Sequence, residues 1–131
     1  MHYVDGYVVP VPKKHLAAYR RMAQKAGKVW REHGALEYVE AAADDVTRGK
    51  RTSFPRSVKL KPGETVVFAY VVYKSRAHRD RVNAKVMKDP RLAPMMDMKA
   101  LPFDARPTTS AASLAVSRKG ASSRVTVTVP L

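Results

Sequence analysis

The segment best equipped for chemistry is Thr52-Ser53-Phe54-Pro55-Arg56, which carries hydroxyls, an aromatic ring and a guanidinium within five residues. Such a set could orient a small anionic or carbonyl ligand, because arginine pairs well with carboxylates and hydroxyls form directed hydrogen bonds. Nucleophilic catalysis does not follow, since no base stands beside Ser53 in the sequence. We therefore predict that Ser53, Phe54 and Arg56 contact a ligand.

Other titratable residues give weaker signals. Asp44 and Asp45 could act as acid and base, although adjacent carboxylates in a turn more often cap backbone amides. The histidines have no spacing that would place two imidazoles on one helical face, and cysteine is absent; they stand at His2, His15, His33 and His78. We expect no metal site and no cofactor. We expect His33 to lie at the end of a helix, where it favours the helix dipole.

The residues that must position this loop form regular elements. Tyr3 to Val11 is rich in β-branched and aromatic residues and ends at prolines, which predicts a strand. From Lys13 to His33 apolar residues recur at three- and four-residue steps, which predicts an amphipathic helix closed by Gly34. Trp30 and Tyr19 fall on its apolar face and are expected in the core. Residues 35–41 fit a second strand.

The second half of the chain repeats this order. Residues 43–63 hold so many glycines, prolines and aspartates that neither a helix nor a long strand is expected, which makes this long loop the first place to look for function. Glu64 to Lys74 predicts a strand. Ser75 then caps a helix that runs to about residue 88 and ends at Asp89-Pro90. One more strand would complete a ferredoxin-like βαββαβ protomer of the α+β class.

The strand from Glu64 to Lys74 is apolar on both faces. Its alternate residues are Val66, Phe68, Tyr70 and Val72 on one side and Val67, Ala69, Val71 and Tyr73 on the other. A sheet with helices on one face only should be polar on its other face, so something must also cover the second side. The economical cover is another copy of the chain, and we predict a homodimer.

Several ordered blocks resemble one bacterial family, and they span about residues 2 to 104. They are Tyr3-Val4-Asp5-Gly6-Tyr7-Val8-Val9-Pro10-Val11-Pro12, Asp44-Asp45-Val46, Gly49-Lys50, Thr52-Ser53-Phe54-Pro55-Arg56, Glu64-Thr65-Val66-Val67-Phe68 and Asn83-Ala84-Lys85-Val86-Met87 through Asp89-Pro90-Arg91. This pattern is similar to the YbaA-like family, domain of unknown function 1428. The resemblance implies a dimeric α+β barrel in which two ferredoxin-like protomers pack sheet against sheet. The family has no established activity, so it supplies no catalytic residues.

The resemblance ends at Asp104, which divides the chain into a domain over residues 1–104 and a divergent basic tail over residues 105–131. The tail is rich in Ser, Thr and Ala and lacks acidic residues. A frameshift is one hypothesis, because suitable codons for Thr109 to Ser113 read in another frame give the Phe-Gly-Gly-Phe with which family members open their closing strand; a natural extension is the other. Arg124 to Val129 is the main candidate for the last strand, and Leu114-Ala115-Val116 is the shorter competitor.

Length and charge limit the function classes. A chain of 131 residues without cysteine fits one domain with a real core and excludes disulfide frameworks, thiolate metal sites and cysteine nucleophiles. No apolar run is long enough for a membrane span, and a cytoplasmic location is expected. Residues 1–104 hold 21 basic and 11 acidic side chains, which attracts polyanions without implying specificity.

Three functions therefore remain open. The first is a homodimeric protein that binds, or as an enzyme transforms, a small ligand in a pocket between sheet and helices. The pocket would be lined by Tyr7, Trp30, Phe68 and Tyr70, with Asp5 or Ser53 as its polar groups. The second is binding of nucleic acid or another polyanion through basic helix faces. The third is a structural domain that only dimerises.

Overall fold

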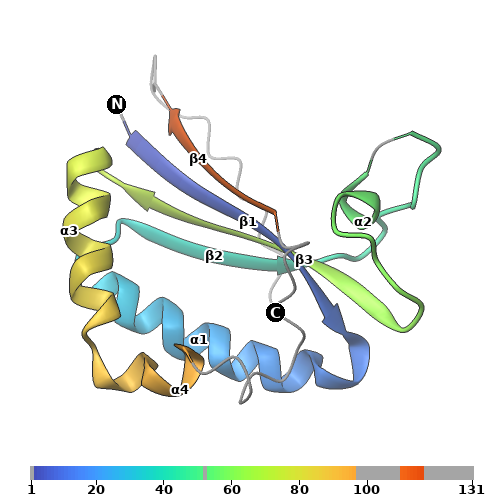
Figure 1. Ribbon diagram of the computed structural model, residues 1–131, viewed down its shortest axis with the longest axis horizontal. Coiled ribbons are helices and arrows are strands. Elements are labelled where there is room, and N and C mark those ends of the chain that lie inside the picture. Colours follow the sequence, from blue (N-terminus) through green and yellow to red (C-terminus); the bar gives the residue numbers. More distant parts are fainter. Residues whose placement is uncertain (1, 52, 97–109, 117–131) are drawn as a thin grey trace.

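The computed structural model describes residues 2–51, 53–96 and 110–116, and it forms an α+β fold around one four-stranded sheet (Figure 1). The strands are β1 (His2–Pro12), β2 (Glu37–Ala42), β3 (Glu64–Tyr73) and β4 (Ser110–Val116). Their order across the sheet is β2-β3-β1-β4, and each neighbouring pair is antiparallel. The two long strands, β1 and β3, are therefore central, and the shorter β2 and β4 form the edges.

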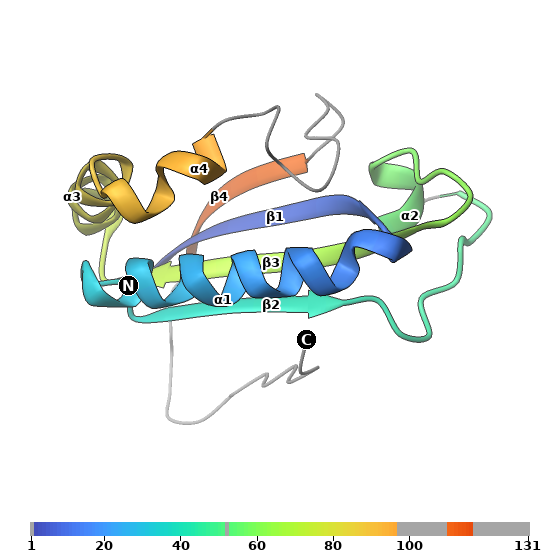
Figure 2. The same ribbon diagram turned by 90° about the horizontal axis from the view of Figure 1, so that it is seen from below.

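The two long helices lie on the same side of this sheet (Figure 2). A short 3-10 turn, η1 (Lys13–His15), leads from β1 into α1 (Leu16–Glu32), and α3 (Arg76–Met87) follows β3. The turn η2 (Pro90–Leu92) and α4 (Ala93–Met96) come next. Gly34 ends the first helical segment with a φ of 116°, a conformation that side chains with a Cβ rarely adopt. Among the described residues, no helix has the length and apolar character needed to cross a bilayer.

The hydrophobic core lies between these helices and the sheet. Tyr7 pairs with Ala69 and Val9 with Val67, so the odd-numbered residues of both central strands face the helices. The buried core residues on this side form two clusters, which contain Ala26, Val29, Ala35, Val71, Tyr73, Val82, Val86 and Leu92 in one and Val9, Val11, Tyr19, Ala23 and Val67 in the other. The predicted core position of Tyr19 is confirmed.

The loop over residues 43–63 contains a helix that the sequence did not predict. This is the four-residue α2 (Phe54–Ser57), so the expectation that no helix survives there was wrong. The Ser53 side chain caps it by accepting a hydrogen bond from the Arg56 amide at 3.2 Å, and Pro55 sits in its first turn, where a missing N–H costs nothing. Pro55, one of the breakers on which the expectation rested, thus lies in the first turn of this helix.

An ionic clamp joins the end of α1 to the turn after α3. His33 Nε2 lies 2.8 Å from Oδ2 of Asp89, and Arg91 Nη2 donates to the same oxygen at 2.8 Å. Arg91 Nη1 also donates to Oε2 of Glu32 at 2.6 Å. The hydrogen bonds from Arg91, and then the one from His33, hold the pKa of Asp89 far below its usual range. His33 therefore works through a specific partner in addition to its place at a helix end.

The last strand lies at Ser110–Val116, so it includes the shorter candidate Leu114-Ala115-Val116. It pairs with β1 from His2 opposite Val116 to Val8 opposite Ser110. The main candidate, Arg124 to Val129, lies outside the described residues. The edge strand β4 thus lies beyond Asp104, where the resemblance to the family ends.

Candidate functional site

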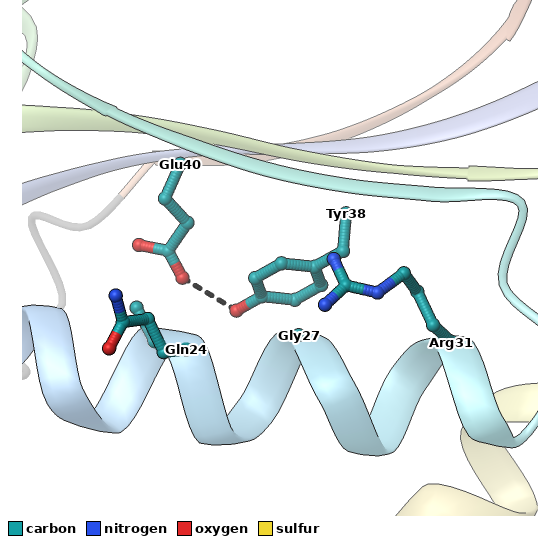
Figure 3. Close-up of a pocket in the computed structure, with 6 residues that line it drawn as sticks. Gln24, Gly27, Arg31, Tyr38 and Glu40 are labelled. Carbon is teal, nitrogen blue, oxygen red and sulfur yellow. Dashed lines mark hydrogen bonds between the residues drawn. The ribbon is translucent and has the colours of Figure 1, made fainter. Parts of the chain in front are cut away.

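A pocket of about 230 Å³ lies between α1 and β2, at the margin of the sheet (Figure 3). One face of α1 provides one wall and the helix-facing residues of β2 provide the other. The lining residues are Ala23, Gln24, Gly27, Arg31, Tyr38 and Glu40. Helical spacing places the α1 residues on one stripe, and strand alternation turns Tyr38 and Glu40 toward it. The pocket therefore follows directly from how one helix lies across one edge strand.

Gly27 allows the two walls to approach each other. A Cβ on Gly27 would lie 2.8 Å from Cδ1 of Tyr38, which is closer than real Cβ atoms come, and 3.2 Å from Cε1, which is tighter than most Cβ contacts. The tyrosine ring therefore lies against the bare helix backbone, and it also contacts Trp30 with ring centroids 5.8 Å apart. Glycine in a helix interior costs about 1 kcal/mol relative to alanine. Here the missing Cβ leaves the space that the Tyr38 ring occupies.

Glu40 is held by two phenols at the inner end of the pocket. Tyr38 Oη donates to Oε1 of Glu40 at 2.5 Å, and Tyr19 Oη donates to Oε2 at 2.5 Å. Burial raises the pKa of Glu40, while the two hydrogen bonds oppose that shift. Burial, with the Glu40 charge second, raises the pKa of both tyrosines well above the usual value of 10.0. The phenols remain protonated, and Glu40 has a fixed orientation.

The other polar groups of the pocket come from α1. Gln24 and Arg31 flank Gly27 on the helix, and Figure 3 shows the Arg31 side chain reaching from α1 toward Tyr38. Within the described ranges, no ion pair or hydrogen bond occupies the Arg31 guanidinium. The site thus combines a cation, an amide and an oriented carboxylate. The carboxylate can accept a hydrogen bond or a proton from a ligand, and the guanidinium can bind an anionic group.

Three of the residues predicted from the sequence lie on the helix side of the sheet, though outside the lining of this pocket. Asp5 is 3% exposed, and Arg79 Nη1 lies 3.7 Å from its Oδ2. Burial, and then the Asp5 charge, raises the pKa of Tyr7. Trp30 donates from Nε1 to Oδ1 of Asn83 at 3.3 Å and packs beside the pocket residue Tyr38.

Phe68 and Tyr70 lie on the opposite face of the sheet. They occupy even-numbered positions of β3, opposite Val8 and Gly6, whereas Tyr7 pairs with an odd-numbered residue. The Phe68 ring is in contact with Tyr70 at a centroid distance of 5.9 Å and with Phe54 of α2 at 5.7 Å. The structure therefore does not bring Tyr7, Trp30, Phe68 and Tyr70 together in one cavity, because strand alternation separates them.

The loop residues Ser53 and Arg56 organise their own loop. Ser53 Oγ donates to the Arg48 carbonyl at 2.7 Å in addition to capping α2. Arg56 Nε is shared between the carbonyls of Arg48 at 3.1 Å and Gly49 at 3.0 Å. Thr52 lies outside the described residues, and Asp44 and Asp45 are exposed. These contacts are those of a folded loop, and they sit apart from the pocket.

Sequence reasoning missed Glu40, Arg31 and Gln24 as site residues. Two signals pointed to them. Gly27 lies within a segment that otherwise favours a helix strongly, and a glycine there indicates that another part of the chain approaches the helix backbone closely. Glu40 is an acidic residue on the same face as Tyr38, which is unusual for a strand side that packs on a helix. Within the part of the chain that the structure describes, no group of three or more metal-ligating side chains occurs.

Comparison with known proteins shows the family of this chain and leaves its activity open. The family described as "Protein of unknown function (DUF1428)" matches residues 2–105. "Uncharacterized protein YbaA" of Escherichia coli strain K12 is 45% identical over 106 residues, which cover 81% of this chain and 89% of that protein. The protein of the same name from Shigella flexneri gives the same identity and coverage. By sequence match over most of its length, the chain belongs to the DUF1428 family.

Proposed function

We propose that this protein binds a small organic ligand in the pocket between α1 and β2. One observation carries the proposal: a partly buried glutamate, oriented by two phenols, shares a pocket with an arginine that has no partner among the described residues. Such convergent polar groups with perturbed pKa values are typical of binding sites. A purely structural carboxylate would not need an open pocket in front of it.

We further propose that the working unit is a homodimer of ferredoxin-like protomers, packed as an α+β barrel. The strand order β2-β3-β1-β4 with helices α1 and α3 on one face supports the protomer fold. Phe68 is 38% and Phe54 48% exposed, and both lie on the face away from those helices. A second copy would bury these rings and leave the α1–β2 pocket outside the contact.

The proposal is tested by ligand titration of 15N-labelled protein. Amide shifts of Ala23, Gly27 and Tyr38 are followed while a library of small polar compounds is added. A ligand should move these amides together and saturably, and Tyr38→Phe should weaken the response because Glu40 loses one of its orienting bonds. If no compound moves these amides, the pocket is a packing defect and the proposed function is wrong.

A second candidate is binding to polyanions through α1. The exposed basic residues of this helix are Arg20, Arg21, Lys25, Lys28 and Arg31, against the single acid Glu32, which pairs with Arg91. Binding to nucleic acid should then fall steeply with salt, by counterion release. A preference for particular nucleotide sequences that persists at moderate salt would favour nucleic-acid recognition over simple electrostatic attraction.

A further inference from the structure

We infer that the ligand of this pocket is a small zwitterion of the amino acid type, with its ammonium group against Glu40 and its carboxylate paired with Arg31. The inference rests on the proposed function and names the ligand class. It follows from the different charged groups at the two ends of the pocket, a carboxylate at one and a guanidinium at the other.

At the Glu40 end of the pocket, the carboxylate and the phenols that hold it can only accept hydrogen bonds from a ligand. Tyr19 and Tyr38 each have a single hydroxyl hydrogen, and both hydrogens point to Glu40. In the pocket lining, what remains for a ligand is lone pairs on the Tyr38 oxygen and on the carboxylate. A ligand group that enters here must donate. A cationic donor fits best, because hydrogen bonds between two charged groups are about twice as strong as neutral ones.

The outer part of the pocket offers donors. Arg31 brings five N–H groups in a planar fork, which matches the two oxygens of a carboxylate. Gln24 lies on the other side of Gly27, toward Glu40, where its amide can donate or accept a hydrogen bond (Figure 3). Lys28, which is exposed and three residues from Arg31 on the same helix, strengthens the preference for an anionic group at the Arg31 end.

Size restricts the ligand further. The pocket, at about 230 Å³, falls below the range of roughly 300–1,000 Å³ typical of sites for drug-sized ligands. Nucleotides and large cofactors are too big to be enclosed. A short chain with one charge at each end matches the volume of the pocket and the position of its two charged groups on opposite walls.

The test uses a series of probes that act as a molecular ruler. Glycine, 3-aminopropanoate, 4-aminobutanoate and 5-aminopentanoate differ only in the distance between ammonium and carboxylate. We expect one length to bind best, and to bind roughly tenfold or more tightly than butylamine or butanoate, because each of these lacks one charged contact. The matching hydroxy acid should bind more weakly than the amino acid, because its donor is uncharged.

Matched variants test which residue binds the carboxylate of the probe and which binds its ammonium group. Arg31→Gln should remove the advantage of the amino acid over butylamine, whereas Arg21→Gln, on the same helix and outside the pocket lining, should keep it. Glu40→Gln should remove the preference of 4-aminobutanoate over 4-hydroxybutanoate. If Glu40→Gln does not fold, the comparison of probes on the unchanged protein still decides the question.

The outcomes separate the two proposals. If single-ended probes bind as well as the amino acids, or if Arg31→Gln behaves like Arg21→Gln, the inference is overturned while the pocket remains a ligand site. The same holds if other library compounds move the pocket amides and no amino acid does. If nothing moves those amides, the proposed function fails, and the inferred ligand class fails with it.

Discussion

The ring of Tyr38 lies so close to Gly27 that a Cβ atom on the glycine would come within 2.8 Å of Cδ1. Gly27→Ala should therefore destabilise the protein by about 1–2 kcal/mol, since overpacking outweighs the gain of about 1 kcal/mol in helix propensity. Chemical denaturation measures the change.

The sign of that effect should reverse when the ring is removed. In a Tyr38→Ala background, Gly27→Ala should stabilise by about 0.5–1 kcal/mol, because only the propensity term remains. A double-mutant cycle isolates the contact. A destabilising Gly27→Ala change in both backgrounds would mean that something other than the tyrosine ring requires the glycine.

Glu40 should make stability fall as pH rises above its usual pKa of 4.5. Burial raises the pKa of Glu40, so the folded state binds the proton more tightly than the unfolded chain does. The free energy of unfolding of the wild type, minus that of Glu40→Gln, should therefore decrease from about pH 4.5 up to the folded-state pKa.

The control for this experiment is Glu37→Gln, which changes an exposed glutamate of the same strand. It should not reproduce the downward slope. Parallel pH profiles for the wild type and Glu40→Gln would show that the burial of Glu40 has no consequence for its titration.

The clamp at Asp89 should have the opposite pH dependence. Hydrogen bonds from Arg91, and then from His33, lower the pKa of Asp89, so its contribution to stability is present above the unfolded pKa of 3.8 and is lost as pH falls toward the folded value. Asp89→Asn should lower the melting temperature at neutral pH, and the difference from wild type should shrink in acid. Asp80→Asn, at an ion pair whose carboxylate is 60% exposed, should have little effect at any pH.

Phe68 should control the oligomeric state. Phe68→Glu places a charge on the face proposed to meet a second copy, so it should shift the protein to monomer in light-scattering measurements. Met87→Glu makes the same change at a 59% exposed residue of α3 and should leave the dimer intact. A wild-type monomer at high concentration would remove the barrel proposal and leave the α1–β2 pocket as a site within one chain.

The sequence predicted most of the framework because its periodicity and breakers agree. Prolines at the end of β1, Gly34 after α1 and Ser75 before α3 all mark element ends that the structure shows. The short α2 was missed, because its start depends on one serine cap inside a polar segment. For the last strand, β4 includes the shorter candidate Leu114-Ala115-Val116. The prediction for Arg124 to Val129 stays a prediction, because these residues lie outside the described part of the chain.

The candidate site was harder to predict than the fold. Strand alternation alone could have separated Phe68 and Tyr70 from Tyr7 once the register was known, and the register depends on contacts between distant segments. The position of Glu40 on a helix-facing side of β2 is unusual, but the sequence did not identify its partners, because the phenols that hold it come from α1 and from its own strand. Its role depends on how closely α1 packs on β2, and that distance depends on Gly27, which has no Cβ.

The prolines of β1 have one further effect. The described part of β4 pairs with β1 only as far as Val8, so the segment that carries Pro10 and Pro12 has no partner from β4. Both prolines pair with β3 positions, and their nitrogens cannot donate, so both must point away from that strand. This side of β1 therefore presents carbonyls without matching amides at Pro10 and Pro12, so another strand could not form a continuous ladder with it there. We therefore expect the two prolines to prevent edge-to-edge pairing of this end of β1 with a strand of another molecule.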